Sequence, residues 1–340
     1  MRLDARKTAI LRTVVEEHIK TGQPVGSRTV VRKYHLGLSP ATVRNEMADL
    51  EEMGYLVQPH TSAGRVPSDR GYRVYVDELM EETKLSRDET RWIEQQLNSR
   101  VRDIVSLIRE TARVVSEATN YLSLVLGPQL DNTLCQSVHL LRVGPERALV
   151  VITTETGFVE SRLVDIPPMS DEDMDAFSQA LTKNLAGRKM ADLPDRLASM
   201  KDEVSRYGKV VSALMDFLSS ALAEREERLY MGGQANILNQ PEFRDSRKAC
   251  EVFSALESDE VVDKLFDIPA GSAVSVLIGE ENPLCGVKDC GLVRGTFQLG
   301  SALGKIGVLG PKRMDYARAV AIVRFVEEKI SDFFGGRSGW

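Results

Sequence analysis

The chain has 340 residues, of which 42% are apolar and 28% are charged. This length allows two or three domains, and the composition is typical of a folded globular protein rather than a disordered one. No apolar run reaches the roughly 18 residues that a membrane-spanning helix needs. The first apolar stretch contains acidic residues, which a secretory signal does not. We therefore expect a cytoplasmic protein with no membrane partner.

The net charge of −6 is unevenly distributed along the chain. Residues 1–75 carry 12 Lys and Arg against 8 Asp and Glu, a net charge of +4. The remaining residues carry 32 against 42, a net charge of −10. A basic end attached to an acidic body indicates that the N-terminal end binds nucleic acid while the rest serves another purpose.

The N-terminal segment predicts a helix-turn-helix. Residues 4–20 have apolar side chains at helical spacing, and Gly22 and Pro24 then favour a helix end. Ser27 begins a second, short helix, and residues 35–38 form a tight turn before a third helix. Three short helices with such a turn before the third are typical of this motif.

The third helix is predicted to begin at Ser39, a good N-cap, with Pro40 at the first helical position. One stripe of this helix, containing Val43, Met47 and Leu50, is apolar and should face a core. The opposite face has few acids in its first two turns, which suits an approach to DNA. A solvated helix face that happens to lack acids is the alternative interpretation.

The outward face of this helix carries residue types that read DNA bases. Arg44 suits guanine edges and Asn45 suits adenine edges, whereas the small Ala41 and Thr42 permit close approach. We predict that Arg44 and Asn45 contact bases, with Ser39 at the start of the same DNA-binding segment.

A β-hairpin wing is predicted after this helix. Residues 55–57 and 66–67 resemble short strands around a polar loop at 58–65, with Arg65 near its tip. Such a wing could reach phosphates or the minor groove, although an ordinary surface hairpin is the alternative. The predicted wing and backbone contacts are Arg28, Lys33, His60, Thr61, Ser62 and Arg65.

The rest of the chain mixes helical and strand patterns. A helix at 69–82 is followed by a capping box, Ser86 to Glu89, and by one long helix or two in series over 87–119. That segment could transmit a change to the DNA-binding end or simply pack against the body. Strand patterns lie at 134–165, helical patterns dominate from 171 to 226, and strands return after 273 before a final helix at 315–334. This order predicts an α+β body with an insertion.

Catalytic and metal-binding patterns are absent from the sequence. It contains no GxSxG, HExxH or GxxxxGK[ST] segment. The four cysteines, Cys135, Cys250, Cys285 and Cys290, form no CxxC pair and have no nearby His. We expect no enzyme activity, no cofactor and no metal.

Three segments resemble a known family. SPATVRNEMADLEEMGYLVQPHTSAGRVPSDRGYRVYVD (39–77) is similar to the N-terminal domain of the heat-inducible transcription repressor HrcA family, and the resemblance continues in YMGGQANILNQPEF (230–243) and GKIGVLGPKRMDYARAV (304–320). It implies a GAF-like α+β domain interrupted by a mainly helical dimerising insert. We therefore divide the chain into a winged helix-turn-helix domain at 1–82, a helical connector at 83–120, a GAF-like domain at 121–170 and 236–340, and an insert at 171–235.

The same resemblance implies a function. It predicts a homodimeric repressor that binds double-stranded DNA at an inverted-repeat operator, CIRCE, upstream of chaperone operons. It also implies that a GroEL-type chaperonin keeps the repressor in its active folded state. The alternative hypothesis is a transcriptional regulator that senses a small molecule through the GAF-like domain. A pocket lined by polar groups in the body would favour this second hypothesis.

Overall fold

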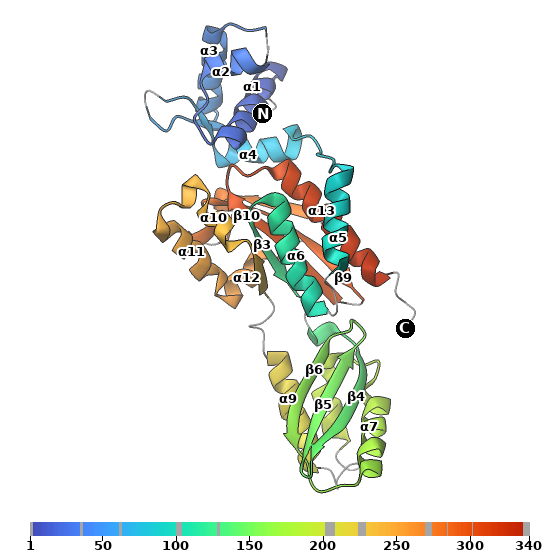
Figure 1. Ribbon diagram of the computed structural model, residues 1–340. Helices are drawn as coiled ribbons and strands as arrows, with labels where there is room; N and C mark the ends of the chain where they lie inside the picture. Colours follow the sequence, from blue (N-terminus) through green and yellow to red (C-terminus); the bar gives the residue numbers. More distant parts are fainter. Residues whose placement is uncertain are drawn as a thin grey trace.

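The structure, a computed structural model, describes residues 3–34, 37–60, 63–99, 104–127, 130–200, 208–223, 229–268, 274–283, 285–300 and 302–335. Three parts follow one another along the molecule: the N-terminal helices at one end, a body built around a five-stranded sheet, and a second lobe at the opposite end (Figure 1). Helices and sheets are both present in quantity, so the predicted α+β class is confirmed.

The N-terminal part has the predicted winged-helix order. Three helices are followed by a two-stranded antiparallel hairpin: α1 (Ala5–Thr21), α2 (Ser27–Tyr34), α3 (Pro40–Glu52), β1 (Leu56–Val57) and β2 (Val66–Pro67). Gly22 ends α1 with a φ of 65°, a left-handed conformation that glycine adopts without a steric penalty. Local sequence signals therefore set the boundaries of this part.

The segment after the wing is helical in three pieces. These are α4 (Asp69–Val74), which continues as the π-helical turn η1 (Tyr75–Leu79), then α5 (Arg87–Ser99) and α6 (Ile104–Thr119). The capping box that begins α5 is confirmed, because the Ser86 N–H donates to a Glu89 carboxylate oxygen at 2.8 Å and the Glu89 N–H donates to the Ser86 hydroxyl at 3.2 Å. The segment 87–119 is therefore two helices.

The body is organised around an antiparallel sheet with the strand order β7-β3-β10-β9-β8. Its strands are β3 (Leu122–Leu126), β7 (Leu229–Gly232), β8 (Val274–Ile278), β9 (Cys290–Leu299) and β10 (Ala302–Pro311). Helices cover both faces, with α5, α6 and α13 (Tyr316–Gly335) on one side (Figure 1). The other side is covered by α10 (Gln234–Leu238), α11 (Ser246–Leu256) and α12 (Asp259–Leu265).

The side chains of the central sheet alternate between these two helical layers. In β3, Leu124 packs with the α10–α12 layer while Val125 packs with the α6 and α13 layer. Ile104 and Ile108 of α6 are buried in the same cluster as α13. The predicted connector therefore packs as a layer of the body.

The second lobe differs from the predicted insert. A separate sheet, β4 (Cys135–Gly144), β5 (Arg147–Thr154) and β6 (Val159–Asp165), packs against α7 (Asp171–Leu185), α8 (Leu193–Ser199) and α9 (Gly208–Ala223). Residues 135–165 therefore belong with these helices and not with the predicted GAF-like segment 121–170, and β7 lies in the central sheet rather than in the predicted insert at 171–235. We call residues 134–223 the inserted lobe.

The physical reason for this error is that alternation shows only that one face of a strand is buried. Val138, Val150 and Ile152 face α7 and α9, yet their pattern would be the same in either sheet. Which strands pair is determined by contacts across the chain. The insert is consequently a mixed lobe with a core of its own rather than a mainly helical one.

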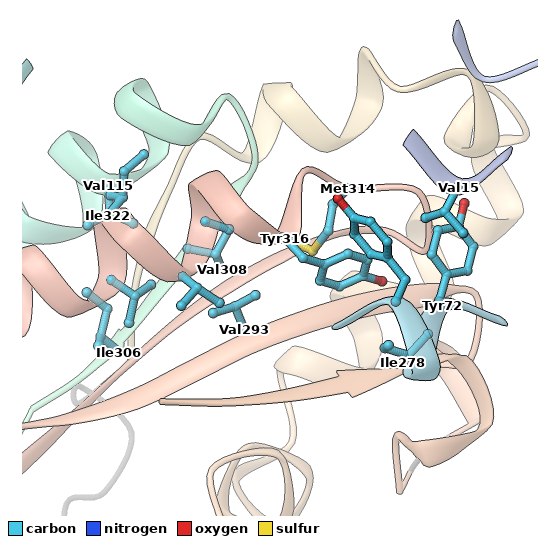
Figure 2. Packing of buried hydrophobic residues seen from close by; sticks show 14 of the residues in the cluster. Val15, Tyr72, Val115, Ile278, Val293, Ile306, Val308, Met314, Tyr316 and Ile322 are labelled. Atoms are coloured by element: carbon cyan, nitrogen blue, oxygen red, sulfur yellow. The ribbon is translucent and has the colours of Figure 1, made fainter. Parts of the chain in front are cut away.

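The winged-helix part and the body share one continuous core. Tyr72 of α4 is 2% exposed, and its ring centroid lies 6.1 Å from that of Tyr316, which is also buried (Figure 2). Val15 of α1 and Met314 before α13 belong to the same cluster. The Tyr72 hydroxyl lies 2.6 Å from Nδ1 of His18. We call this contact region, centred on His18, Tyr72 and Tyr316, the junction.

Ion pairs surround the junction. Lys312 lies 2.9 Å from Asp69, and the Glu280 N–H donates to the same carboxylate at 3.0 Å. Arg73 of α4 pairs with Glu281, and its guanidinium also donates to the Val276 carbonyl at 2.7 Å. These contacts fix α4 against the edge of the central sheet. The winged-helix part is consequently docked on the body.

The junction is expected to weaken in acid because the half-buried His18 is held there with a lowered pKa. Burial, and secondarily Arg313, lower the pKa of His18 from 6.5 to about 4. The unfolded chain therefore binds more protons between these values, so this stabilisation is complete above the unfolded pKa and is lost as the pH falls through that window. Denaturant unfolding near neutral pH and near pH 5 should show a larger acid loss for the wild type than for His18→Gln. Equal losses would contradict this role of His18.

Candidate nucleic-acid interface

The first turn of α3 is capped as the sequence predicts. The Ser39 hydroxyl accepts from the Thr42 N–H at 3.1 Å and lies 2.9 Å from the Thr42 hydroxyl. Pro40 occupies the first helical position. Ser39 and Thr42 therefore build the helix start. The positive end of the helix dipole at this point favours an anion such as a phosphate.

The two long faces of α3 differ in exposure. Val43, Met47 and Leu50 are buried in the core, so the opposite face points away from it. That face presents Ala41, Arg44 and Asn45, all exposed. Neither Arg44 nor Asn45 makes an ion pair or hydrogen bond with another residue that the structure describes. Both side chains are therefore available to a ligand.

Three of the four acidic residues of α3 pair with cations outside the helix, whereas Glu52, in its last turn, is exposed. Glu46 and Asp49 face α1 and form ion pairs there with Lys7, at 2.6 and 2.8 Å. Glu51 pairs with Arg65 at 2.8 Å. The carboxylates of Glu46, Asp49 and Glu51 are thus each paired with a cation that lies outside α3.

The wing is pinned at its base to the turn between α1 and α2. The Val25 N–H donates to the Arg65 carbonyl at 2.8 Å, and the Arg65 N–H donates to the Val25 carbonyl at 2.9 Å. A Cβ on Gly64 would lie only 2.4 Å from the Val25 carbonyl oxygen, so the backbone can approach this closely only at a glycine. The helix-turn-helix and the wing therefore form one surface.

Two predicted backbone contacts have partners inside the chain. Arg65 lies at the base of the wing and not near its tip, with a side chain that is 20% exposed and paired with Glu51. Lys33 pairs at 2.6 Å with the buried Glu17. The sequence pattern placed the strands and the loop correctly, but Arg65 is the last residue of that loop, beside β2, where it contacts Val25 and Glu51. Arg28 and His60 are exposed, and Thr61 and Ser62 lie outside the described residues.

Lys7, Glu17 and Glu51 were not among the residues predicted for the site. Glu51 pairs with Arg65, Glu17 pairs with Lys33, and Lys7 pairs with Asp49. The two residues of each pair are 14 to 42 positions apart in the sequence. No spacing rule within one helix detects such a pair. The excess of basic residues in the first 75 positions was the only available signal.

A groove lies outside this interface, between the linker after η1 and helix α13. Its volume is about 490 Å³, its lining includes Met80, Leu85 and Phe325, and the lining residues Arg324 and Glu82 form an ion pair. Among the described residues, no group of three or more His, Cys, Asp or Glu could hold a metal ion. No described helix is both long and apolar enough to cross a membrane.

Comparisons with known proteins agree with this architecture. Residues 105–320 match the family model described as the HrcA protein C terminal domain. Two relatives named heat-inducible transcription repressor HrcA, from Moorella thermoacetica and Pelotomaculum thermopropionicum, are 41% and 40% identical. Both alignments cover 97% of this chain, and they cover 98% and 97% of the relatives.

A crystal structure described as that of a hypothetical protein has the same fold. It superposes with a TM-score of 0.70 at 22% sequence identity, over 99% of this chain and 100% of that one. At this identity, the likeness supports the fold alone.

A capped helix whose outward Arg44 and Asn45 have no partner among the described residues, beside a pinned wing, is the arrangement typical of a DNA-binding transcription regulator. The chain belongs to the heat-inducible transcription repressor HrcA family. Its relatives are named as repressors, so the chain is a regulator rather than an enzyme, in agreement with the sequence.

Proposed function

We propose that this repressor binds the CIRCE inverted repeat upstream of chaperone operons as a homodimer, and that a GroEL-type chaperonin maintains its activity. The observation that carries the DNA-binding part is the outward face of α3, where Arg44 and Asn45 are exposed and unpaired among the described residues. The heat-inducible repression in this proposal is inferred from the name of the relatives. The operator and the chaperonin follow from the family resemblance of the sequence.

The two DNA-binding elements have different tasks in this proposal. Arg44 donates to guanine and Asn45 pairs with adenine, while Ala41 allows the helix to approach the bases. The Ser39 hydroxyl accepts from the Thr42 N–H and so fixes the start of α3, whose positive dipole end favours a phosphate. The remaining backbone contacts are assigned to Arg28, Lys33, His60, Thr61, Ser62 and Arg65.

Replacing Arg28 by alanine is expected to reduce the salt dependence of operator binding. Arg28 is exposed and has no partner among the described residues, so it can neutralise one phosphate. The slope of log affinity against log salt should then fall by about 0.9. Binding titrations at several salt concentrations measure this slope. An unchanged slope would remove Arg28 from the DNA backbone.

Arg65→Ala provides the comparison for that measurement. Because Arg65 is paired with Glu51, we expect its loss to change the slope less than the loss of Arg28 does. An equal or larger change would show that Arg65 exchanges Glu51 for a phosphate in the complex.

A homodimer is proposed because an inverted repeat offers two half-sites related by a twofold axis. The inserted lobe has a surface suited to a second copy. In its sheet, Leu141 lies opposite Leu149, and Leu149 lies opposite Leu163, on the face that α7 and α9 leave uncovered. Val143 and Val159 on this face are exposed as well. A contiguous apolar sheet face of this kind is typical of an interaction site.

Leu141→Asp is expected to convert the dimer to a monomer, because it places a charge on this apolar face, beside Leu149 of the central strand β5. Leu141 is 53% exposed, so the fold should tolerate the substitution. Light scattering coupled to size-exclusion chromatography measures the mass. Leu303→Asp is the matched control, since Leu303 is 58% exposed but lies on β10 of the body. A variant that remains dimeric would exclude this face as the interface.

The chaperonin part of the proposal depends on marginal stability. If the DNA-competent form is only slightly favoured, a change of about 1–2 kcal/mol alters its abundance several-fold. The test is operator binding by freshly refolded protein with and without the chaperonin. An active fraction that rises with chaperonin supports the proposal. An active fraction that chaperonin leaves unchanged would contradict it.

The second candidate is a regulator that senses a small molecule. The observation that favours it is the groove beside α13, whose lining combines apolar and charged side chains and includes Ala317, the neighbour of Tyr316 in the junction. A thermal-shift screen with metabolites tests this function. A metabolite that raises the melting temperature and changes operator affinity would support it over chaperonin control.

A further inference from the structure

Lys7 lies where the first turns of α1 meet the side of α3. Its Nζ is 2.6 Å from a Glu46 carboxylate oxygen and 2.8 Å from an Asp49 carboxylate oxygen. The side chain is only 13% exposed. Arg6, the residue before it, reaches Glu46 from the other side at 3.3 Å. Two cations of α1 therefore neutralise the two acids that follow Asn45 on α3.

Those acids lie close to the proposed DNA-reading face. Successive residues of an α-helix are rotated by about 100°, so Asp49 is displaced by about 40° from Asn45. Glu46 lies further round, toward α1. The major groove is about 12 Å wide, which is close to the diameter of a helix with its side chains. The flanks of α3 would therefore lie beside the phosphates of the two strands.

An unbalanced carboxylate in that position would oppose binding. Like charges brought together at an interface are unfavourable, and the effect is reduced by salt. Asp49 is half-exposed, so its charge would reach the phosphates if Lys7 did not offset it. The outward face of α3 alone does not show this requirement, because the neutralising cation belongs to α1.

We propose that Lys7 is a positioning residue that offsets Glu46 and Asp49, so that phosphates tolerate the flank of α3. This inference rests on the proposed DNA-binding function and assigns to that function a residue outside the recognition helix. Lys7 acts through the two carboxylates and is not itself a base or phosphate contact.

Two further observations fit this role. The ion pairs with Asp49 and Glu46 raise the pKa of Lys7, so its charge is retained at any pH at which DNA binding is measured. Ion pairs near a protein surface generally add little to stability. A cation held between two carboxylates on the flank of a DNA-reading helix therefore affects binding more than folding.

The test uses the full chain and a fluorescent duplex that carries the inverted repeat from the chaperone operon of the same genome. Affinity is measured at several KCl concentrations for the wild type, Lys7→Gln, the double variant Glu46→Gln/Asp49→Asn, and the triple variant that combines all three changes. Lys264→Gln is the matched control, because Lys264 forms a similar 2.6 Å ion pair with Glu260 on α12 of the body.

We expect Lys7→Gln to weaken binding roughly tenfold at low salt, with a smaller loss at high salt because repulsion is screened. The triple variant should return to within about twofold of the wild type, since the uncompensated carboxylates are gone. The double variant should bind at least as tightly as the wild type. Lys264→Gln should bind as the wild type does.

A triple variant that binds as weakly as Lys7→Gln would overturn the proposal, because Lys7 would then contact DNA or support the fold directly. Wild-type affinity in Lys7→Gln would also overturn it. Melting temperatures are measured in parallel. The double variant loses the ion pairs of Lys7 but keeps Lys7 itself, so its melting temperature shows how much these ion pairs contribute to stability. Failure of the proposed DNA-binding function would give a different result from failure of the Lys7 proposal. In that case, the wild type itself would not distinguish the operator from a scrambled duplex.

Discussion

Arg44→Ala is expected to weaken operator binding by roughly 1–3 kcal/mol and to relax the base preference at one position of each half-site. The reason is geometric. Arg44 projects from the exposed face of α3, opposite Val43, Met47 and Leu50, and no described residue competes for its guanidinium. A bidentate contact of Arg with guanine accounts for both the loss of affinity and the loss of discrimination.

Titration of the wild type and Arg44→Ala against duplexes with each half-site position changed in turn measures this effect. The position that Arg44 reads is the one whose substitution no longer matters to the variant. Arg247→Ala is the control, because Arg247 is an exposed arginine of α11 in the body, away from α3 and from the proposed dimer face (Figure 1). Unchanged affinity and selectivity in Arg44→Ala would contradict the assigned role.

Tyr72→Ala is expected to destabilise the chain by about 3–5 kcal/mol, as is typical when a large buried aromatic side chain is truncated. Tyr72 is buried between α1 and Tyr316 and also contacts His18. Its removal empties the centre of the junction. We therefore also expect the winged-helix part to unfold separately from the body, as two transitions instead of one.

Calorimetry and denaturant unfolding, followed by circular dichroism and by the fluorescence of Trp92 in α5, measure both effects. Tyr72→Phe keeps the ring and loses only the hydrogen bond to His18, so it should cost about 1 kcal/mol and leave the transitions coupled. A Tyr72→Ala variant that unfolds in the same single transition as Tyr72→Phe would show that Tyr72 does not couple the two parts.

The features that sequence predicted well are determined within a few residues. The Ser39 cap, the Ser86–Glu89 capping box and the glycine end of α1 depend on hydrogen bonds or backbone conformations within one turn. The buried stripe of α3 follows from its helical period. Arg44 and Asn45 lie on the predicted exposed face for the same reason, while their contacts with bases remain a prediction.

The features that sequence missed depend on distant partners. Arg65 resembled a wing-tip cation, yet it pairs with Glu51 at the base. Lys33 resembled a phosphate contact, yet it neutralises the buried Glu17. Strands β4 to β6 have an alternation that fits either sheet, and only their packing on α7 to α9 assigns them to the inserted lobe. Predicting each of these features requires knowing which distant segments of the chain contact one another in the fold.

The placement of the α3 acids gives a physical account of how an acidic chain can present a DNA-binding surface. The carboxylates of Glu46 and Asp49 are offset by Lys7, and that of Glu51 by Arg65, so the first two turns of the outward face keep Arg44 and Asn45 as polar groups and the exposed Glu52 is confined to the last turn. The junction then fixes this surface on the body through α4. Body geometry would in this way set the spacing of two such surfaces in a dimer.

The central claim is that two copies read an inverted repeat through α3, and operator spacing tests it most directly. The full chain is titrated against the inverted-repeat duplex, a scrambled duplex, and a duplex with about five base pairs, half a helical turn, inserted between the half-sites. We predict one dimer per inverted repeat, with affinity at least about a thousandfold above that for scrambled DNA. The insertion should abolish that preference. Equal affinity for all three duplexes would contradict the account.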